Sequence, residues 1–290
     1  MARTRSRPLS LLDTTAVVYQ LHGHSLQQAA VRDAVAGKDV EVPVFVRMEY
    51  LRGLILNLIE MWALIRESVT VQDAFVDWSQ KVRQERKLKV VLMTVPQWLA
   101  GHEGWASKDK TLRRLGDLTV RLVWGFDEAY RRPPADPLAC VLGRVDIVRQ
   151  TYDDDLLLDF YERFKAIQEG VPDCRLCEFR QAQRRRLRRR QVDLTGPESR
   201  VRYASNQGIL RQADVLQEAE ATRDRRPRCR WCERLGDTLI ALLAGRGVVV
   251  TADRTHEALG ELLGQPVVLL PSLAELKRRL AASGNNAGRG

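Results

Sequence analysis

The sequence predicts an α/β fold with a mainly parallel sheet flanked by helices, assembled from both ends of the chain. Short apolar runs near the two ends, such as Gly247–Thr251, suit strands that are buried on both faces. Segments whose apolar residues recur at helical spacing adjoin these runs, and most of the middle of the chain shows the same spacing. We therefore expect a core formed by residues 1–66 and 233–290. A mostly helical insertion over 67–232 would carry a pair of zinc knuckles with four cysteine ligands.

The amino-terminal part predicts two strands and a long helix. Residues 10–21 contain the first strand and the start of a helix, and residues 26–36 favour another helix. A second strand is predicted over Val42–Arg47, with Pro43 near its start, where a missing N–H is tolerated. Arg47–Arg66 predicts a strong helix, because its apolar residues recur at helical spacing and form a wide stripe.

The insertion combines helices with one strand that would join the core. Lys89–Val95 is an apolar run typical of a buried strand. Helices are predicted over Val69–Gln84, Ser107–Arg132, Gly208–Arg223 and from Asp153 to about Gln168, and a polar loop over Asp193–Gly208.

The carboxyl-terminal part alternates between helix and strand, which is the pattern of a parallel sheet. Gly245 and Gly247 mark the end of its first helix. The predicted helices are Glu233–Ala244, Thr255–Leu263 and Ser272–Ala281, and the predicted strands are Gly247–Thr251 and Pro266–Leu270.

Four carboxylates stand at or just after predicted strand ends, or on adjoining helices. Asp13 ends the first apolar run, and Asp253 follows the strand over 247–251. Glu49 and Asp237 lie on adjoining helices. In doubly wound sheets, binding sites form at the carboxyl ends of the strands. Carboxylate oxygens are the ligands that Mg²⁺ and Mn²⁺ prefer, so this pattern predicts a site for such an ion.

The carboxylates belong to four motifs, LLDTTAVV (11–18), VFVRMEYLRG (44–53), LGDTLIALLA (235–244) and VVVTADRTHEAL (248–259). In this order the motifs resemble the PIN-domain nuclease family, whose pattern is D…E…D…TxD. The resemblance covers roughly 10–66 and 233–282 and leaves the middle of the chain unmatched. It implies a PIN-like core with metal-binding, catalytic carboxylates at Asp13, Glu49, Asp237 and Asp253.

The resemblance also implies an activity: metal-dependent hydrolysis of phosphodiester bonds, in RNA more than in DNA. Thr251 and Thr14 would orient a water molecule or the ligands around Mg²⁺ or Mn²⁺. Many relatives are toxins, so a protein inhibitor or antitoxin is a partner to consider, and so is a second copy of the chain. The large insertion departs from the compact form of those toxins.

A second hypothesis is a catalytically silent PIN-like module that uses zinc and arginines to bind nucleic acid. This hypothesis leaves four carboxylates clustered without a compensating positive charge, and like charges held together are electrostatically unfavourable. We therefore expect an enzyme.

Two CxxC pairs, Cys174 with Cys177 and Cys229 with Cys232, are separated by 51 residues. Two such pairs predict a tetrahedral structural zinc site. The alternative is a pair of disulfides, which a reducing compartment disfavours. Cys232 precedes Asp237 by five residues, so zinc would hold the end of the insertion beside the predicted active-site helix.

The chain is strongly basic, with a formal net charge of +10 and 39 arginines among its 47 basic residues. Guanidinium groups match phosphate oxygens, so nucleic acid is the expected partner, although a GC-rich genome would favour arginine codons equally. Arg52, three residues after Glu49, is either a phosphate contact or half of an ion pair. The densest arginine run is a phosphate-binding segment or a solvated arm. It contains Arg184, Arg185, Arg186, Arg188, Arg189 and Arg190.

The chain contains no run of 18 or more apolar residues, so we expect no membrane span. The apolar stretch near the amino terminus is short and breaks at Asp13, which argues against a signal peptide. We expect a cytoplasmic protein.

Overall fold

The computed structural model describes residues 8–83, 107–130, 147, 152–169, 197–207, 209–211, 214, 229–245 and 247–287. The chain forms two compact units. The first comprises Met1–Arg47, Arg132–Cys140 and Asp173–Gly290. The second comprises Met48–Arg131 and Val141–Pro172. The division therefore falls inside a helix, between Arg47 and Met48, and each unit is described by itself.

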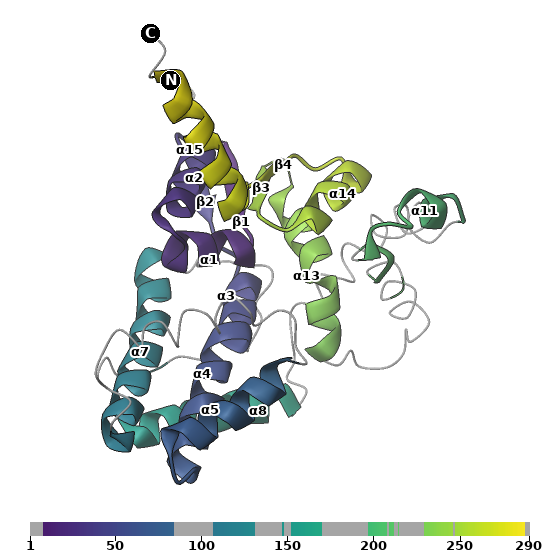
Figure 1. Ribbon diagram of the computed structural model, residues 1–290. Coiled ribbons are helices and arrows are strands. Elements are labelled where there is room, and N and C mark those ends of the chain that lie inside the picture. The colour runs from purple at the N-terminus through teal and green to yellow at the C-terminus, as the bar shows by residue number, and fades with distance from the viewer. Residues whose placement is uncertain are drawn as a thin grey trace, which may run out of the picture. The chain divides into compact units, whose positions relative to one another are not determined.

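The first unit contains a four-stranded sheet in the order β2-β1-β3-β4, with every neighbouring pair parallel. Its strands are β1 (Leu9–Leu12), β2 (Asp39–Glu41), β3 (Val248–Thr251) and β4 (Val267–Leu269). The predicted α/β class with a parallel sheet is confirmed, although the sheet is small and most described residues are helical (Figure 1).

The two central strands come from opposite ends of the chain. Leu12 of β1 pairs with Val250 of β3, and both side chains are buried. An apolar run without alternation suits a strand covered on both faces, and β1 and β3 have that environment. The predictions for these two strands are confirmed to within a residue.

The connections between strands run in opposite directions from this central pair. Helices α1 (Thr14–His22) and α2 (Ser25–Val35) lead from β1 outward to β2. Helix α14 (Arg254–Leu263) leads from β3 outward to β4 on the other side. Because parallel crossovers are right-handed, α1 and α2 cover one face of the sheet and α14 covers the other. The carboxyl ends of β1 and β3 therefore form a topological switch point.

Two more helices complete the described core of this unit. Helix α13 (Cys229–Ala244) packs against β1, β3 and α14, and helix α15 (Leu273–Ala287) packs against α2 (Figure 1). Ser272 begins α15 with a reciprocal cap, because its hydroxyl accepts from the Glu275 N–H while Glu275 Oε2 accepts from Ser272.

The second unit is helical in its described residues. Its elements are the end of α3 (Val44–Tyr50), a π-helical turn η1 (Leu51–Ile55), α4 (Leu56–Glu67), α5 (Val71–Arg83), α7 (Lys108–Ala129) and α8 (Asp154–Glu169). Helix α4 packs against α5, α7 and α8. Its fully buried Trp62 donates from Nε1 to the Tyr152 hydroxyl at 2.9 Å. The apolar stripe predicted on this helix therefore forms the core of the second unit.

The predicted strand over Val42–Arg47 is wrong. The strand β2 lies earlier, at Asp39–Glu41, and residues 44–50 are helical. The Pro43 carbonyl accepts hydrogen bonds from Val46 N at 2.9 Å and Arg47 N at 3.3 Å, which start the helix. The run is buried all round, and a short apolar run of that kind has the same sequence pattern in a helix as in a strand.

A second prediction is wrong in the insertion, where Asp193–Gly208 was expected to be a loop. Residues 197–202 form the short helix α11 (Pro197–Arg202) instead. The predicted strand Lys89–Val95, the arginine run and the first cysteine pair lie outside the described residues. Within the described ranges, every helix is too short or too polar to span a bilayer.

Gly247 allows the close approach of β3 to β1. A Cβ at this position would lie 2.7 Å from the Leu9 carbonyl oxygen and 3.0 Å from the Ala244 carbonyl oxygen. Both are backbone atoms, so the strands would have to move apart. We expect Gly247→Ala to lower the free energy of unfolding in urea by about 1–3 kcal/mol.

The control for this prediction is Gly53→Ala, because a Cβ on Gly53 meets no atom within 4 Å. Gly53 lies in a helical segment, so this substitution should leave the stability unchanged or raise it. Equal unfolding midpoints for Gly247→Ala and the parent protein would show that the strand pair does not need glycine there.

Candidate functional site

The candidate site lies at the switch point, where β1 and β3 end side by side. Asp13 follows β1 directly, and its backbone N–H donates to the Val250 carbonyl at 3.1 Å. Asp253 is the second residue after β3 and is the N-cap of α14. The predicted placement of these two carboxylates at the same edge of the sheet therefore agrees with the fold.

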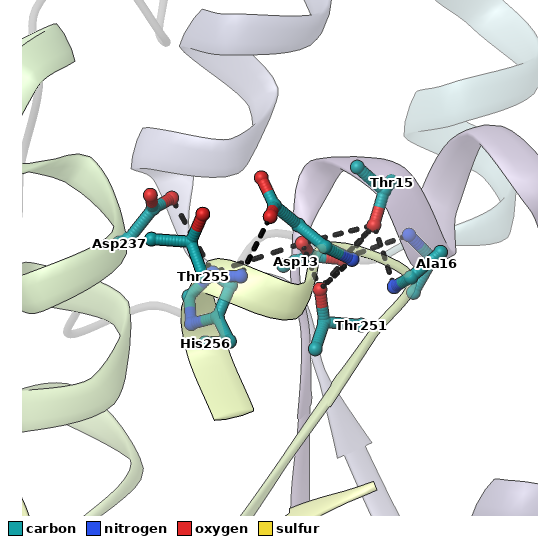
Figure 2. Close-up of polar contacts among 9 residues, drawn as sticks. Asp13, Thr15, Ala16, Asp237, Thr251, Thr255 and His256 are labelled. Atoms are coloured by element: carbon teal, nitrogen blue, oxygen red, sulfur yellow. Dashed lines mark hydrogen bonds and ion pairs between the residues drawn. The ribbon is translucent and has the colours of Figure 1, made fainter. Parts of the chain in front are cut away.

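Asp13 is held by more hydrogen bonds than a helix cap requires. It is the N-cap of α1, and Oδ1 accepts from the Ala16 N–H at 2.8 Å. The Thr15 hydroxyl lies 2.9 Å from Oδ1 and 3.0 Å from Oδ2, and the Thr251 hydroxyl donates to Oδ2 at 2.6 Å (Figure 2). The residue is only 4% exposed, so the carboxylate is fixed in a buried setting.

The two threonines also bind the backbone that leaves β3. Thr251 Oγ1 accepts from the Asp253 N–H at 2.8 Å, and Thr15 Oγ1 accepts from the Ala252 N–H at 2.8 Å. Each hydroxyl therefore donates to Asp13 and accepts from the segment after β3. This arrangement ties the first turn of α1 to the start of α14.

His256 lies between Asp13 and Asp237. Its Nε2 is 3.3 Å from Asp237 Oδ1 and 3.7 Å from Asp13 Oδ2 (Figure 2). The side chain is fully buried, and neither ring nitrogen has a hydrogen-bond partner in the described part of the chain. The contacts to the two carboxylates are ion pairs when the imidazole is protonated.

The other two carboxylates approach His256 from two different helices. Asp237 lies in the middle of α13, which packs against α14, and its side chain is 30% exposed. Asp253 is the N-cap of α14, and its Oδ1 accepts from the Thr255 N–H at 2.8 Å. Asp237 and Asp253 are thus both partly exposed, whereas Asp13 is buried.

The pKa values of both buried groups are raised, for different reasons. Burial raises the pKa of Asp13, although the charge of His256 and the hydrogen bonds from Thr251, Ala16 and Thr15 oppose that shift. Burial by itself lowers the pKa of His256. The contact with Asp237 and the charges of Asp237, Asp13 and Asp253 outweigh burial, so the pKa of His256 is raised. Three carboxylates around one imidazole favour a positive charge at this point.

The structure brings together Asp13, Asp237, Asp253 and Thr251 of the predicted site residues. Thr15 makes contacts with Asp13 and with the segment after β3, and the role expected for Thr14 stays a prediction. Glu49 lies on α3 and Arg52 in the π-helical turn. Both belong to the second unit, so their relation to the site stays a prediction.

Two of the predicted zinc ligands fall among the described residues. Cys229 and Cys232 belong to the first turn of α13, the helix that carries Asp237. Cys174 and Cys177 lie outside the described residues, as do Arg184, Arg185, Arg186, Arg188, Arg189 and Arg190.

His256 was not among the predicted site residues. A signal for it exists: His256 stands three residues after Asp253 and near the start of the same helix, so the two share a face.

The donor atoms of the site suit a hard divalent cation, because carboxylate and hydroxyl oxygens are the ligands that Mg²⁺ and Mn²⁺ take. A buried imidazole without hydrogen bonds adds a nitrogen donor. Among the described residues, however, no three His, Cys, Asp or Glu side chains stand close enough to hold an ion as they are. Metal binding would therefore need these side chains to move closer together.

Comparisons with models of protein families, with curated proteins and with solved structures found no match for this chain.

Thr251 gives the site a stability test. Replacing Thr251 by Val keeps the shape but leaves the buried Asp13 carboxylate without its 2.6 Å donor and the Asp253 N–H without its acceptor. We expect the free energy of unfolding to fall by about 1–3 kcal/mol, because buried polar groups lose their partners. Thr251→Ser keeps the hydroxyl and is the control. A Val variant at least as stable in urea as the Ser variant would contradict this role.

Proposed function

We propose that this protein is a metal-dependent nuclease that hydrolyses phosphodiester bonds, with RNA as the favoured substrate. The observation that carries the proposal is the convergence of three carboxylates from three segments on one buried histidine. Asp13 follows β1, Asp237 lies on α13 and Asp253 begins α14, and all three act on His256. This convergence occurs at the switch point of a parallel sheet, where such folds bind ligands.

A purely structural interpretation accounts for only part of this arrangement. Asp13 and Asp253 are N-caps, and an N-cap carboxylate is a common stabilising feature of a helix. Asp237 is not a cap, because it lies eight residues after the first residue of α13. A third carboxylate near two others raises the electrostatic cost of the fold. Binding a cation is a function that would offset this cost.

The residues that would hold Mg²⁺ or Mn²⁺ are Asp13, Asp237 and Asp253, with Glu49 as a further predicted ligand. When bound, the ion supplies positive charge that stabilises a phosphate under attack and makes water a better nucleophile. The protein's part is to fix Asp13 through Thr15 and Thr251, so that its oxygens point in one direction. Asp237 supplies a carboxylate at the solvent-facing side, where a phosphodiester can approach.

The positive charge of the chain supports a nucleic-acid substrate. A net charge of +10 attracts the phosphate backbone, and the arginine run over 184–190 is the densest basic segment. The preference for RNA comes from the resemblance of the four motifs to PIN-domain nucleases.

Conservative changes of the carboxylates test the activity. Asp237→Asn and Asp253→Asn keep the side-chain shape, and asparagine still caps a helix at position 253. We expect Mn²⁺- or Mg²⁺-dependent cleavage of labelled RNA to fall by orders of magnitude, while the circular dichroism spectrum stays unchanged. EDTA should abolish cleavage by the parent protein.

Asp155→Asn is the matched control, because Asp155 is an exposed carboxylate in the first turn of α8. This variant should cleave like the parent protein. If neither RNA nor DNA is cut with either metal ion, the protein is a silent module and the proposal is overturned. DNA cleavage without RNA cleavage would correct only the substrate.

We also propose a structural zinc ion held by Cys174, Cys177, Cys229 and Cys232. Four thiolates close the coordination shell of zinc, so this ion would stabilise and not catalyse. We expect about one equivalent of zinc in protein purified without chelator, measured by elemental analysis. Cys229→Ser should lose the zinc and lower cleavage, because α13 carries both Cys229 and Asp237. Full zinc content in that variant would overturn the assignment, and Cys140→Ser is the control.

A further inference from the structure

The imidazole of His256 has no role in the hydrogen bonds that build the site. It is fully buried, and neither nitrogen has a hydrogen-bond partner in the described ranges. Native proteins satisfy nearly all buried polar atoms, and an exception calls for a specific explanation, such as an ion. The nearest charged atoms to Nε2 are Asp237 Oδ1 and Asp13 Oδ2, at 3.3 Å and 3.7 Å.

Two carboxylate oxygens lie near the same imidazole nitrogen, as the ligands of one ion would. Ligands of Mg²⁺ lie about 2.0–2.1 Å from the ion in near-octahedral geometry, which places adjacent donor atoms about 2.8–3.0 Å apart. The separations of 3.3 Å and 3.7 Å are longer, so the ring and the two carboxylates would move closer together around an ion.

We propose that His256 Nε2 is a ligand of the divalent ion, together with Asp13 Oδ2 and Asp237 Oδ1. This inference rests on the proposed nuclease function and deepens it, because it names a nitrogen ligand in a site otherwise made of oxygens. Mg²⁺ takes oxygen ligands and dehydrates reluctantly. Imidazole is a ligand for transition-metal ions, so the site should bind Mn²⁺ more tightly than Mg²⁺.

The fold supplies a reason for the ring's position. His256 is the third residue of α14, and this helix starts where Thr251 fixes the backbone of Asp253. Helix α13 packs against α14 and brings Asp237 to the same ring nitrogen that faces Asp13. One ion at this point would link the end of β1 with α13 and α14. Metal binding should therefore stabilise the first unit as well as create the active site.

If His256 only fills space and is not a ligand, its removal should change the metal affinity in the opposite direction. If His256 only occupies the space between the two carboxylates, it competes with an ion, and its removal should tighten metal binding. If His256 is a ligand, its removal should weaken metal binding. The sign of the change therefore distinguishes the two roles.

The experiment uses the untagged full chain, freed of divalent ions at the carboxylates and titrated separately with Mn²⁺ and Mg²⁺ by calorimetry. We expect His256→Gln to weaken Mn²⁺ binding at least about tenfold and Mg²⁺ binding by less. Pulsed electron paramagnetic resonance of bound Mn²⁺ should show coupling to ¹⁴N in the parent protein and lose it in His256→Gln. This spectrum needs no variant in order to detect a nitrogen ligand.

His24→Asn is the matched control, because His24 is an exposed N-cap of α2 and asparagine keeps the cap. Its Mn²⁺ affinity and ¹⁴N coupling should equal those of the parent protein. Mn²⁺ binding without ¹⁴N coupling, or tighter binding by His256→Gln, would overturn the ligand role and leave the nuclease proposal standing. No Mn²⁺ or Mg²⁺ binding by the parent protein would overturn both.

Discussion

The candidate site depends on the hydrogen bond from the Thr251 hydroxyl to the Asp13 carboxylate. It joins residues 238 positions apart at 2.6 Å, because the parallel pairing of Leu12 with Val250 places the two strand ends side by side. The same hydroxyl accepts from the Asp253 N–H and so sets the start of α14. A buried carboxylate without donors would destabilise the fold. The constraint that keeps Asp13 in place is therefore the one that positions His256.

The site combines a buried carboxylate with a partly exposed one. Asp13 is buried and receives hydrogen bonds on both oxygens, so its orientation is determined by the fold. Asp237 is 30% exposed and contacts the same imidazole nitrogen as Asp13 does. Rigid donors lower the cost of organising a binding site. The hydrogen bonds on Asp13 therefore fix one side of the site in advance, and Asp237 completes the contacts to His256.

Local sequence patterns predicted β1, β3 and the carboxylates that follow them, because a buried parallel strand and its carboxyl end have a strong signature. Val42–Arg47 was misassigned because Pro43 starts a buried helix whose residues are as apolar as those of a strand. The contact between His256 and Asp237 depends on the packing of α13 against α14, which no local pattern encodes. The contacts of Thr15 with Asp13 and with Ala252 depend on the rotation of the first turn of α1 about the Asp13 cap.

Helix α13 connects the end of the predicted insertion to the candidate site. Its first turn contains Cys229 and Cys232, its middle carries Asp237, and the helix packs against β1 and β3. A helix transmits a shift along its axis with little loss, because its backbone hydrogen bonds keep it rigid. Contacts that fix the first turn of α13 therefore also fix the position of Asp237 along the helix axis relative to His256. Displacement of the cysteine end of α13 should thus reach the candidate site through Asp237, while the contact between Asp13 and Thr251 remains in place.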